Sequence, residues 1–200
     1  PKGRVELRLV VNVGSVLEDD DQRGLAHFVE HMAFNGSEHF NGNQLIDTME
    51  RFGMRFGAHL NAHTSFDETV YKLQVPSKPD LLDKGLLVLR DWAGGLSFDA
   101  KEIEKERGVV LDEWRRTRGV QGRIMDTVVP LQFKGSKYAK RLPIGTEKSL
   151  KTFTRDQALR FYRDWYRPNL MAVVTVGDFD LDDMEAKIKA NFSHLKNPTP

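Results

Sequence analysis

Apolar and polar positions along the chain follow two different periods, which predict strands and helices in turn. Alternation by twos and short apolar runs predict strands, the last of them buried, over residues 5–13, 55–62, 69–75 and 170–176. Apolar residues spaced three or four apart predict helices over residues 24–34, 41–51, 81–92, 101–118, 155–167 and 182–192. Residues 119–133 continue as a helical or irregular stretch, and residues 134–151 show the least periodicity.

The order of these elements predicts the fold class. Helices and strands are interleaved, yet residues 55–75 have the pattern of a β-hairpin. We therefore expect an α+β fold with a mixed, largely antiparallel β-sheet and helices packed on one face. Two hundred residues with 40% hydrophobic content are enough for one core, so residues 1–200 are expected to form a single domain.

One predicted helix carries the pattern H-x-x-E-H at His27, Glu30 and His31. Two imidazoles four positions apart lie about 40° apart around an α-helix, so both can reach one metal ion. Glu30 lies to the other side of His27, where a general base for a metal-activated water would be needed. The chain has no cysteine, so histidine and carboxylate groups must supply every metal ligand. The pattern predicts a zinc site with a third protein ligand elsewhere.

The helix predicted over residues 101–118 offers candidates for that ligand. Glu106 and Glu113 are seven residues apart and therefore lie on one helix face, whereas Glu102 and Glu104 are typical of a solvated face. Helix geometry alone does not separate Glu106 from Glu113.

The other histidines are weaker candidates. His59 and His63 are four apart, but they fall in a stretch predicted to be a strand, where they would be about 13 Å apart. They could not bind one ion, although His63 could lie near the cleft. His39 and His194 are expected to be structural.

Four segments in the same order resemble the blocks of the pitrilysin-like M16 (inverzincin) metallopeptidases, within that family the bacterial PqqL-type branch. The segments are GLAHFVEHMAFNGSEHFNGN (24–43), NAHTSFDETVY (61–71), EKERGVVLDEW (104–114) and FYRDWYRPNLMAVVTVGDF (161–179). The resemblance implies a zinc-dependent endopeptidase, and an M16 peptidase domain that is one of several homologous domains in a larger protein.

The resemblance also implies a role for each motif residue. His27 and His31 match the ligands of one Zn²⁺ ion, and Glu30 matches the catalytic base. The local pattern E-R-x-x-x-x-x-E-W makes Glu113 the third ligand and Glu106 the supporting acidic residue.

A substrate-binding strand is implied as well. Asn61, Ala62 and Thr64 match positions on a strand that borders the family's cleft. Substrate would pair there as an added strand, which suits a peptide or an unfolded polypeptide. The family further implies homologous C-terminal M16 domains, in the same protein or a partner subunit, that close the catalytic chamber.

Charge and hydropathy limit which other classes of partner are expected. A formal net charge of +1, without a basic stripe interleaved with aromatic residues, argues against a nucleic-acid partner. No apolar run is long enough to span a membrane, and no signal peptide is visible. The chain begins at Pro1 rather than at methionine, so we expect a fragment of a longer protein. The resemblance places that protein in the bacterial cell envelope, in the periplasm.

Two other functions stay open at this point. A catalytically inactive M16 homologue could act as a structural or peptide-binding subunit. Against this, the three expected zinc ligands His27, His31 and Glu113 and the expected base Glu30 are all present. A metal-binding domain without proteolytic activity would require Glu30 to be merely structural.

Overall fold

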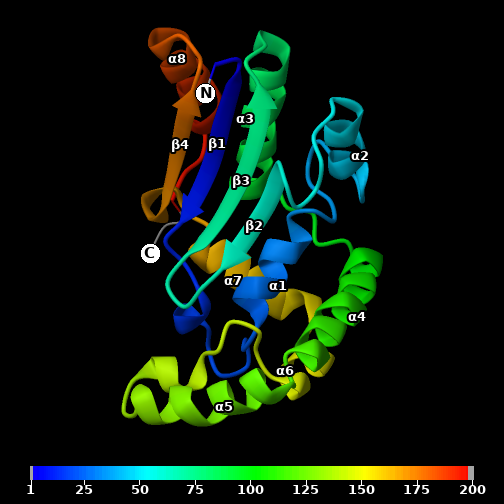
Figure 1. Ribbon diagram of the computed structural model, residues 1–200, viewed down its shortest axis with the longest axis vertical. Helices are drawn as coiled ribbons and strands as arrows, with labels where there is room; N and C mark the ends of the chain where they lie inside the picture. The colour runs from blue at the N-terminus through cyan, green and yellow to red at the C-terminus, as the bar shows by residue number, and fades with distance from the viewer. Residues whose placement is uncertain (1, 198–200) are drawn as a thin grey trace.

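Four antiparallel strands form the sheet of the computed structural model, which describes residues 2–197 (Figure 1). The strands are β1 (Arg4–Val11), β2 (Leu60–Thr64), β3 (Thr69–Pro76) and β4 (Met171–Gly177). Their order across the sheet is β2-β3-β1-β4, and every pairing is antiparallel. The predicted α+β fold is confirmed. Among the four described strands, β2 pairs with β3 alone and forms one edge of the sheet, and Leu60 at its start also bridges to Phe56.

The helices follow the predicted spacing, with ends shifted by a few residues. They are α1 (Leu25–Met32), α2 (Gln44–Arg51), α3 (Pro79–Gly94), α4 (Ala100–Arg116), α5 (Val120–Gln132), α6 (Glu147–Thr152), α7 (Arg155–Trp165) and α8 (Leu181–Phe192). Short 3-10 turns lie at Ser15–Leu17, Lys137–Lys140 and Pro168–Leu170. A capping box opens α7: Thr154 and Gln157 stand in the sequence as T-x-x-Q, the spacing typical of this motif. The sequence gives little sign of α6, which is only six residues long and starts at a cap on Thr146.

One face of the sheet is covered by helices and the other is open. Along β1, Val5, Leu7, Leu9 and Val11 are buried, while the residues between them are partly exposed. Helix α3 crosses behind β1 and β3, with α8 beside it (Figure 1). The expected packing of helices on one face is therefore confirmed, because a two-residue period places every second side chain against the helix layer.

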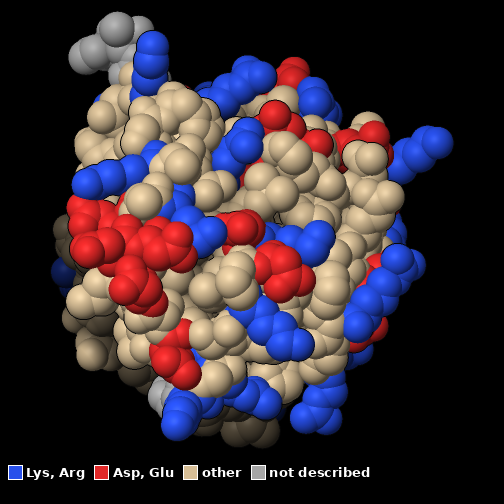
Figure 2. All heavy atoms as spheres, turned by 90° about the horizontal axis from the view of Figure 1, so that it is seen from above, with Lys and Arg blue, Asp and Glu red and all other residues tan. Residues whose placement is uncertain are grey.

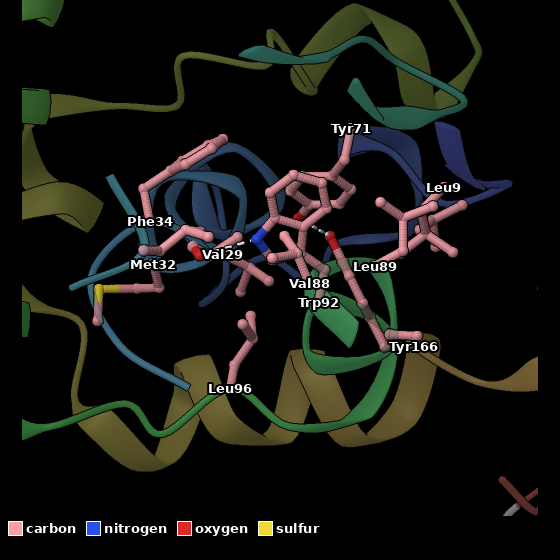
Figure 3. Packing of buried hydrophobic residues seen from close by; sticks show 14 of the residues in the cluster. Leu9, Val29, Met32, Phe34, Tyr71, Val88, Leu89, Trp92, Leu96 and Tyr166 are labelled. Atoms are coloured by element: carbon pink, nitrogen blue, oxygen red, sulfur yellow. Dashed lines mark hydrogen bonds between the residues drawn. The ribbon is translucent and has the colours of Figure 1, made fainter. Parts of the chain in front are cut away.

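Aromatic side chains join this layer to the helix that carries the histidine motif. Trp92 of α3 donates a hydrogen bond from Nε1 to the carbonyl of Ala33, at 2.9 Å, just after the end of α1. Its ring stacks on Tyr71 of β3 at 5.0 Å between centroids, and the Tyr71 hydroxyl lies 2.6 Å from that of Tyr166 (Figure 3). These buried contacts fix the C-terminal end of α1 against the sheet.

Strand β4 differs from its prediction. The apolar run before Gly177 predicts a buried strand, but β4 is an edge strand in the described structure, with Val174 41% and Val176 61% exposed. Both side chains lie on the open face of the sheet, beside Arg8 and Glu6 of β1. An apolar run in the sequence does not show whether helices cover both faces of the sheet at that strand.

The start of β2 also differs from its prediction. Residues 57–59 form a turn in which Gly57, at φ +82°, donates its N–H to the carbonyl of Leu60 at 2.8 Å. His59 therefore lies in this turn and not on a strand, and its Nδ1 accepts the N–H of Arg55 at 3.1 Å. Glycine at positive φ favours the turn over strand continuation.

Acidic and basic side chains are interspersed on the face seen in Figure 2. This distribution agrees with the near-neutral formal net charge. Among residues 2–197, no helix is both long and apolar enough to cross a bilayer.

Candidate metal centre

A buried carboxylate holds the first turn of α1. Glu18 accepts the N–H groups of Gly24, at 3.0 Å, and Ala26, at 2.9 Å, through Oε1. Burial raises the pKa of Glu18 to about 8, although both backbone hydrogen bonds oppose the rise. This contact satisfies N–H groups that the first turn of a helix leaves without partners. It sets the orientation of the turn that presents His27.

The aspartates that lie between Glu18 and this helix have other partners. Asp20 accepts hydrogen bonds from Arg23 and Arg141, and Asp21 pairs with Arg160. Glu18 was not predicted, because no local period links a residue seven positions before a helix to its first turn.

Three of the predicted residues bring ligand atoms together. Nε2 of His27 lies 3.1 Å from Nε2 of His31. Oε2 of Glu113 lies 3.7 Å from Nε2 of His27 and 3.5 Å from Nε2 of His31. The i, i+4 spacing on α1 aligns the two imidazoles, and α4 places Glu113 beside them.

Glu106 contacts the same histidine from behind. Its Oε1 accepts a hydrogen bond from Nδ1 of His31 at 2.7 Å, because a carboxylate can only accept. Its Oε2 accepts one from Nδ2 of Asn35 at 2.9 Å, and Asn35 also donates to the carbonyl of His31. Glu106 thus leaves Nε2 of His31 directed at His27 and Glu113. Asn35 was not predicted, although its position four residues after His31 places it on the same helical face.

The pKa values of His27 and His31 shift in opposite directions. Burial lowers the pKa of His27 to about 4, and the nearby charge of His31 acts in the same direction. Burial alone would lower the pKa of His31, but hydrogen bonds with Glu106 and Glu113 outweigh it and raise the pKa to about 9. The hydrogen bond from His31 lowers the pKa of Glu113. A positive charge at this point is therefore favoured, and a proton on His31 supplies it in the metal-free protein.

Glu30 lies in the same cleft but outside this group of three ligand atoms. The side chain is 7% exposed, and its Oε2 accepts a hydrogen bond from Oγ1 of Thr64 at 2.6 Å. Burial raises the pKa of Glu30, and the bond from Thr64 opposes that rise. A buried carboxylate with a raised pKa is better suited to accept a proton than an exposed one.

Strand β2 forms one wall of the cleft, which has a volume of about 610 Å³. Asn61, Ala62 and Thr64 all line it, as does His63. The metal-ligand candidates, Glu30 and the expected substrate strand therefore share one cavity. The structure brings all eight predicted site residues together around it, with Glu106 contributing from behind His31.

The three ligand atoms fit a zinc ion. Two ligands of a tetrahedral zinc at about 2.05 Å from the metal are about 3.3 Å apart. The separations of 3.1, 3.5 and 3.7 Å bracket that value. Two imidazole nitrogens and one carboxylate oxygen are also a common ligand set of catalytic zinc.

A second group of side chains that could hold a metal ion, Glu38, His39 and Asp91, is engaged in other contacts. Glu38 pairs with Arg90 at 3.1 Å. Buried Asp91 accepts from Oγ of Ser37 at 2.6 Å and from the backbone N–H and Nδ1 of His39 at 3.0 and 2.8 Å. These bonds attach the loop after α1 to α3.

Two family models match the chain. The insulinase model, peptidase family M16, matches residues 1–128, which contain all the site residues. The model of the peptidase M16 inactive domain matches residues 152–200.

Curated relatives include proteins named as zinc proteases. "Probable zinc protease PqqL" of Haemophilus influenzae is 43% identical over 199 residues, covering 99% of this chain and 21% of the relative. "Zinc protease PQQL-like" of Arabidopsis thaliana is 42% identical over 199 residues, covering 98% of this chain and 21% of the relative. The chain thus spans about a fifth of the length of these relatives.

Solved structures agree with the sequence comparisons. The first half of the periplasmic protease PqqL from Escherichia coli has a TM-score of 0.94 and 38% identity, covering all of this chain and 43% of that one. A mutant of the ferredoxin protease FusC, in complex with Arabidopsis ferredoxin, has a TM-score of 0.92 and 33% identity. The match covers 100% of this chain and 22% of that one. The resemblance seen in the sequence motifs is confirmed, and the chain belongs to the insulinase family of peptidases, family M16.

Proposed function

We propose that this chain is the catalytic domain of a zinc-dependent endopeptidase that hydrolyses peptides or unfolded polypeptides. The observation that carries the proposal is the convergence of two imidazoles and a carboxylate within one cleft that also holds a buried glutamate. The family's zinc proteases support the reaction type.

His27, His31 and Glu113 are the proposed ligands of one zinc ion. Zinc, when bound, acts as a Lewis acid that polarises a peptide carbonyl and lowers the pKa of water. Glu106 is a positioning residue for His31, because its hydrogen bond to Nδ1 keeps the proton on that nitrogen and leaves Nε2 available.

Glu30 is the proposed general base. Its carboxylate can accept a proton from the attacking water and later deliver it to the leaving amine nitrogen. Its burial limits competing solvation, which keeps the carboxylate more basic than an exposed glutamate.

The outer edge of β2 is the proposed substrate-binding strand. The carbonyl of His59 accepts a hydrogen bond from the N–H of Gln74, and the N–H of Ser65 donates one to the carbonyl of Glu68. The backbone groups of the odd-numbered residues of β2 therefore point toward β3. The N–H and C=O groups of Ala62 and Thr64 then point away from β3, because antiparallel pairing alternates. Oδ1 of Asn61 accepts from the N–H of Ala62 at 3.0 Å, where a substrate carbonyl would bind. An extended backbone can pair here, as in other strand-addition complexes.

Residues 1–200 are proposed to be a single M16 domain, since β4, from the C-terminal part, pairs with β1 in the same sheet as β2. The remaining walls of the chamber would come from homologous C-terminal M16 domains. A periplasmic location is proposed from the PqqL relative described as periplasmic. Fractionation of cells expressing the full-length protein would locate it.

The proposed function can be tested on the full-length protein with an unstructured peptide. We expect cleavage that a chelator abolishes and zinc restores, and Glu30→Gln should retain zinc while losing orders of magnitude in kcat. Glu104→Gln is the matched control, since Glu104 is an exposed glutamate of α4 that pairs with Arg107. Wild-type protein that binds zinc and peptide without cleavage would favour an inactive homologue that acts as a binding subunit.

A further inference from the structure

Thr64 makes a contact that its expected role in substrate binding does not explain. Its hydroxyl donates to Oε2 of Glu30 at 2.6 Å, and within residues 2–197 no other hydrogen bond reaches that carboxylate. Glu30 is 7% exposed, so water offers little competition for the bond. Hydrogen bonds to charged groups are shorter and stronger than neutral ones, and this length is typical of them.

The Thr64 hydroxyl is itself held in place. Thr64 pairs with Thr69 in the β2–β3 register, and their Oγ1 atoms are 3.4 Å apart. Thr69 is 1% exposed and donates to the carbonyl of Val13 at 2.9 Å. A β-branched side chain on a paired strand has few rotamers. The strand pairing therefore fixes the direction from which Glu30 is held.

We propose that Thr64 is a positioning residue that sets the Glu30 carboxylate relative to a substrate paired with β2. Its backbone groups point to the outer edge of the strand, while its side chain reaches Glu30 on the neighbouring helix. One residue thus links the register of the added substrate strand to the place of the base. This inference rests on the proposed endopeptidase function. Displacing a reacting group by about 1 Å can cost about 100-fold in rate.

A purely structural role gives a different expectation. If the hydroxyl only stabilises a buried carboxylate, its removal should lower stability, with kcat preserved in the folded, zinc-loaded protein. If Thr64 only binds substrate, KM should rise while kcat is kept.

The experiment uses the full-length protein at matched zinc occupancy, with an unstructured peptide. Thr64→Val removes the hydroxyl but keeps the shape, and we expect kcat to fall about 10- to 100-fold with KM within about threefold. Thr64→Ser should restore kcat to within a few-fold. Thr127→Val is the matched control, since Thr127 is an exposed threonine of α5 that bonds only its own helix. Full kcat in Thr64→Val, or an equal loss in Thr64→Ser, would overturn the proposal.

A double-mutant cycle tests whether Thr64 acts through Glu30. In a Glu30→Gln background, adding Thr64→Val should change the residual rate by less than about twofold, because the two residues then act as one unit. Independent, multiplying losses would overturn the proposal even if Thr64→Val expresses poorly. A wild-type protein that cleaves no peptide would instead remove the proposed function, and this inference with it.

Discussion

Glu106 and Glu113 of α4 lie on one face of the helix but contact different atoms of His31. Glu113 approaches Nε2 at 3.5 Å, whereas Glu106 accepts from Nδ1 at 2.7 Å. We expect Glu113→Gln to lose most of the bound zinc, because one of three protein ligands is weakened. Glu106→Gln should retain the metal with about 10- to 100-fold lower affinity or activity.

Metal analysis of the purified variants, with Glu104→Gln as control, measures this difference. If Glu106→Gln loses zinc and Glu113→Gln keeps it, the order of the two glutamates is the reverse of the one proposed.

The raised pKa of His31 predicts that zinc binding depends on pH. In the metal-free protein His31 carries a proton below about pH 9. Zinc needs the Nε2 lone pair, so binding must expel that proton, and the apparent affinity should rise about tenfold per pH unit below pH 9. Above pH 9 the dependence should flatten. Calorimetry in buffers of different ionisation enthalpy counts the released protons, and release of none at pH 7 would contradict the prediction.

At the scale of elements, the start of α1 depends on a close backbone contact with the loop before α6. A Cβ atom on Gly145 would lie 2.6 Å from Cα of Gly24, and the φ of Gly145 is +74°. We expect Gly145→Ala to displace the first turn of α1, which carries His27, and so to lower both stability and zinc affinity.

Gly53→Ala separates steric clash from backbone strain. Gly53 has a similar φ of +79°, but a Cβ there meets nothing within 4 Å. Gly53→Ala should lower the free energy of unfolding by about 1–2 kcal/mol, because alanine disfavours the left-handed conformation. Gly145→Ala should lower it by about 1–3 kcal/mol more, because the added Cβ also overpacks the contact with Gly24. Denaturant unfolding and zinc titration measure both effects. Equal losses in the two variants would show that the contact with Gly24 does not matter.

At the scale of the whole molecule, the chain presents the proposed metal site on one wall of an open cleft. It spans only about a fifth of the length of its curated relatives. Efficient catalysis needs the substrate held in line with the reacting groups. We therefore expect residues 1–200 alone to fold and bind zinc with at least about micromolar affinity, yet to cleave peptides far more slowly than the full-length protein.

The comparison uses one unstructured peptide and matched zinc occupancy for both proteins. Equal rates would show that the remaining domains are dispensable for catalysis.

Local patterns in the sequence were enough to predict much of this protein. The spacing of His27 and His31, the face shared by Glu106 and Glu113, and the capping box of α7 are set within one or two helical turns. The fold class followed from the order of such elements. Their geometry depends on near neighbours in the chain, so it can be read without knowing what packs against them.

Only the tertiary structure decided which groups from distant segments meet. It placed Glu113 beside both histidines and Glu106 behind one of them, although the two glutamates are equivalent by helical spacing. It also brought Glu18 to the start of α1 and Thr64 to Glu30, and left β4 exposed at an edge. The Glu18 contact spans six to eight residues of irregular chain, and the others join residues far apart in sequence. All of them depend on how the segments pack. No local period records that packing.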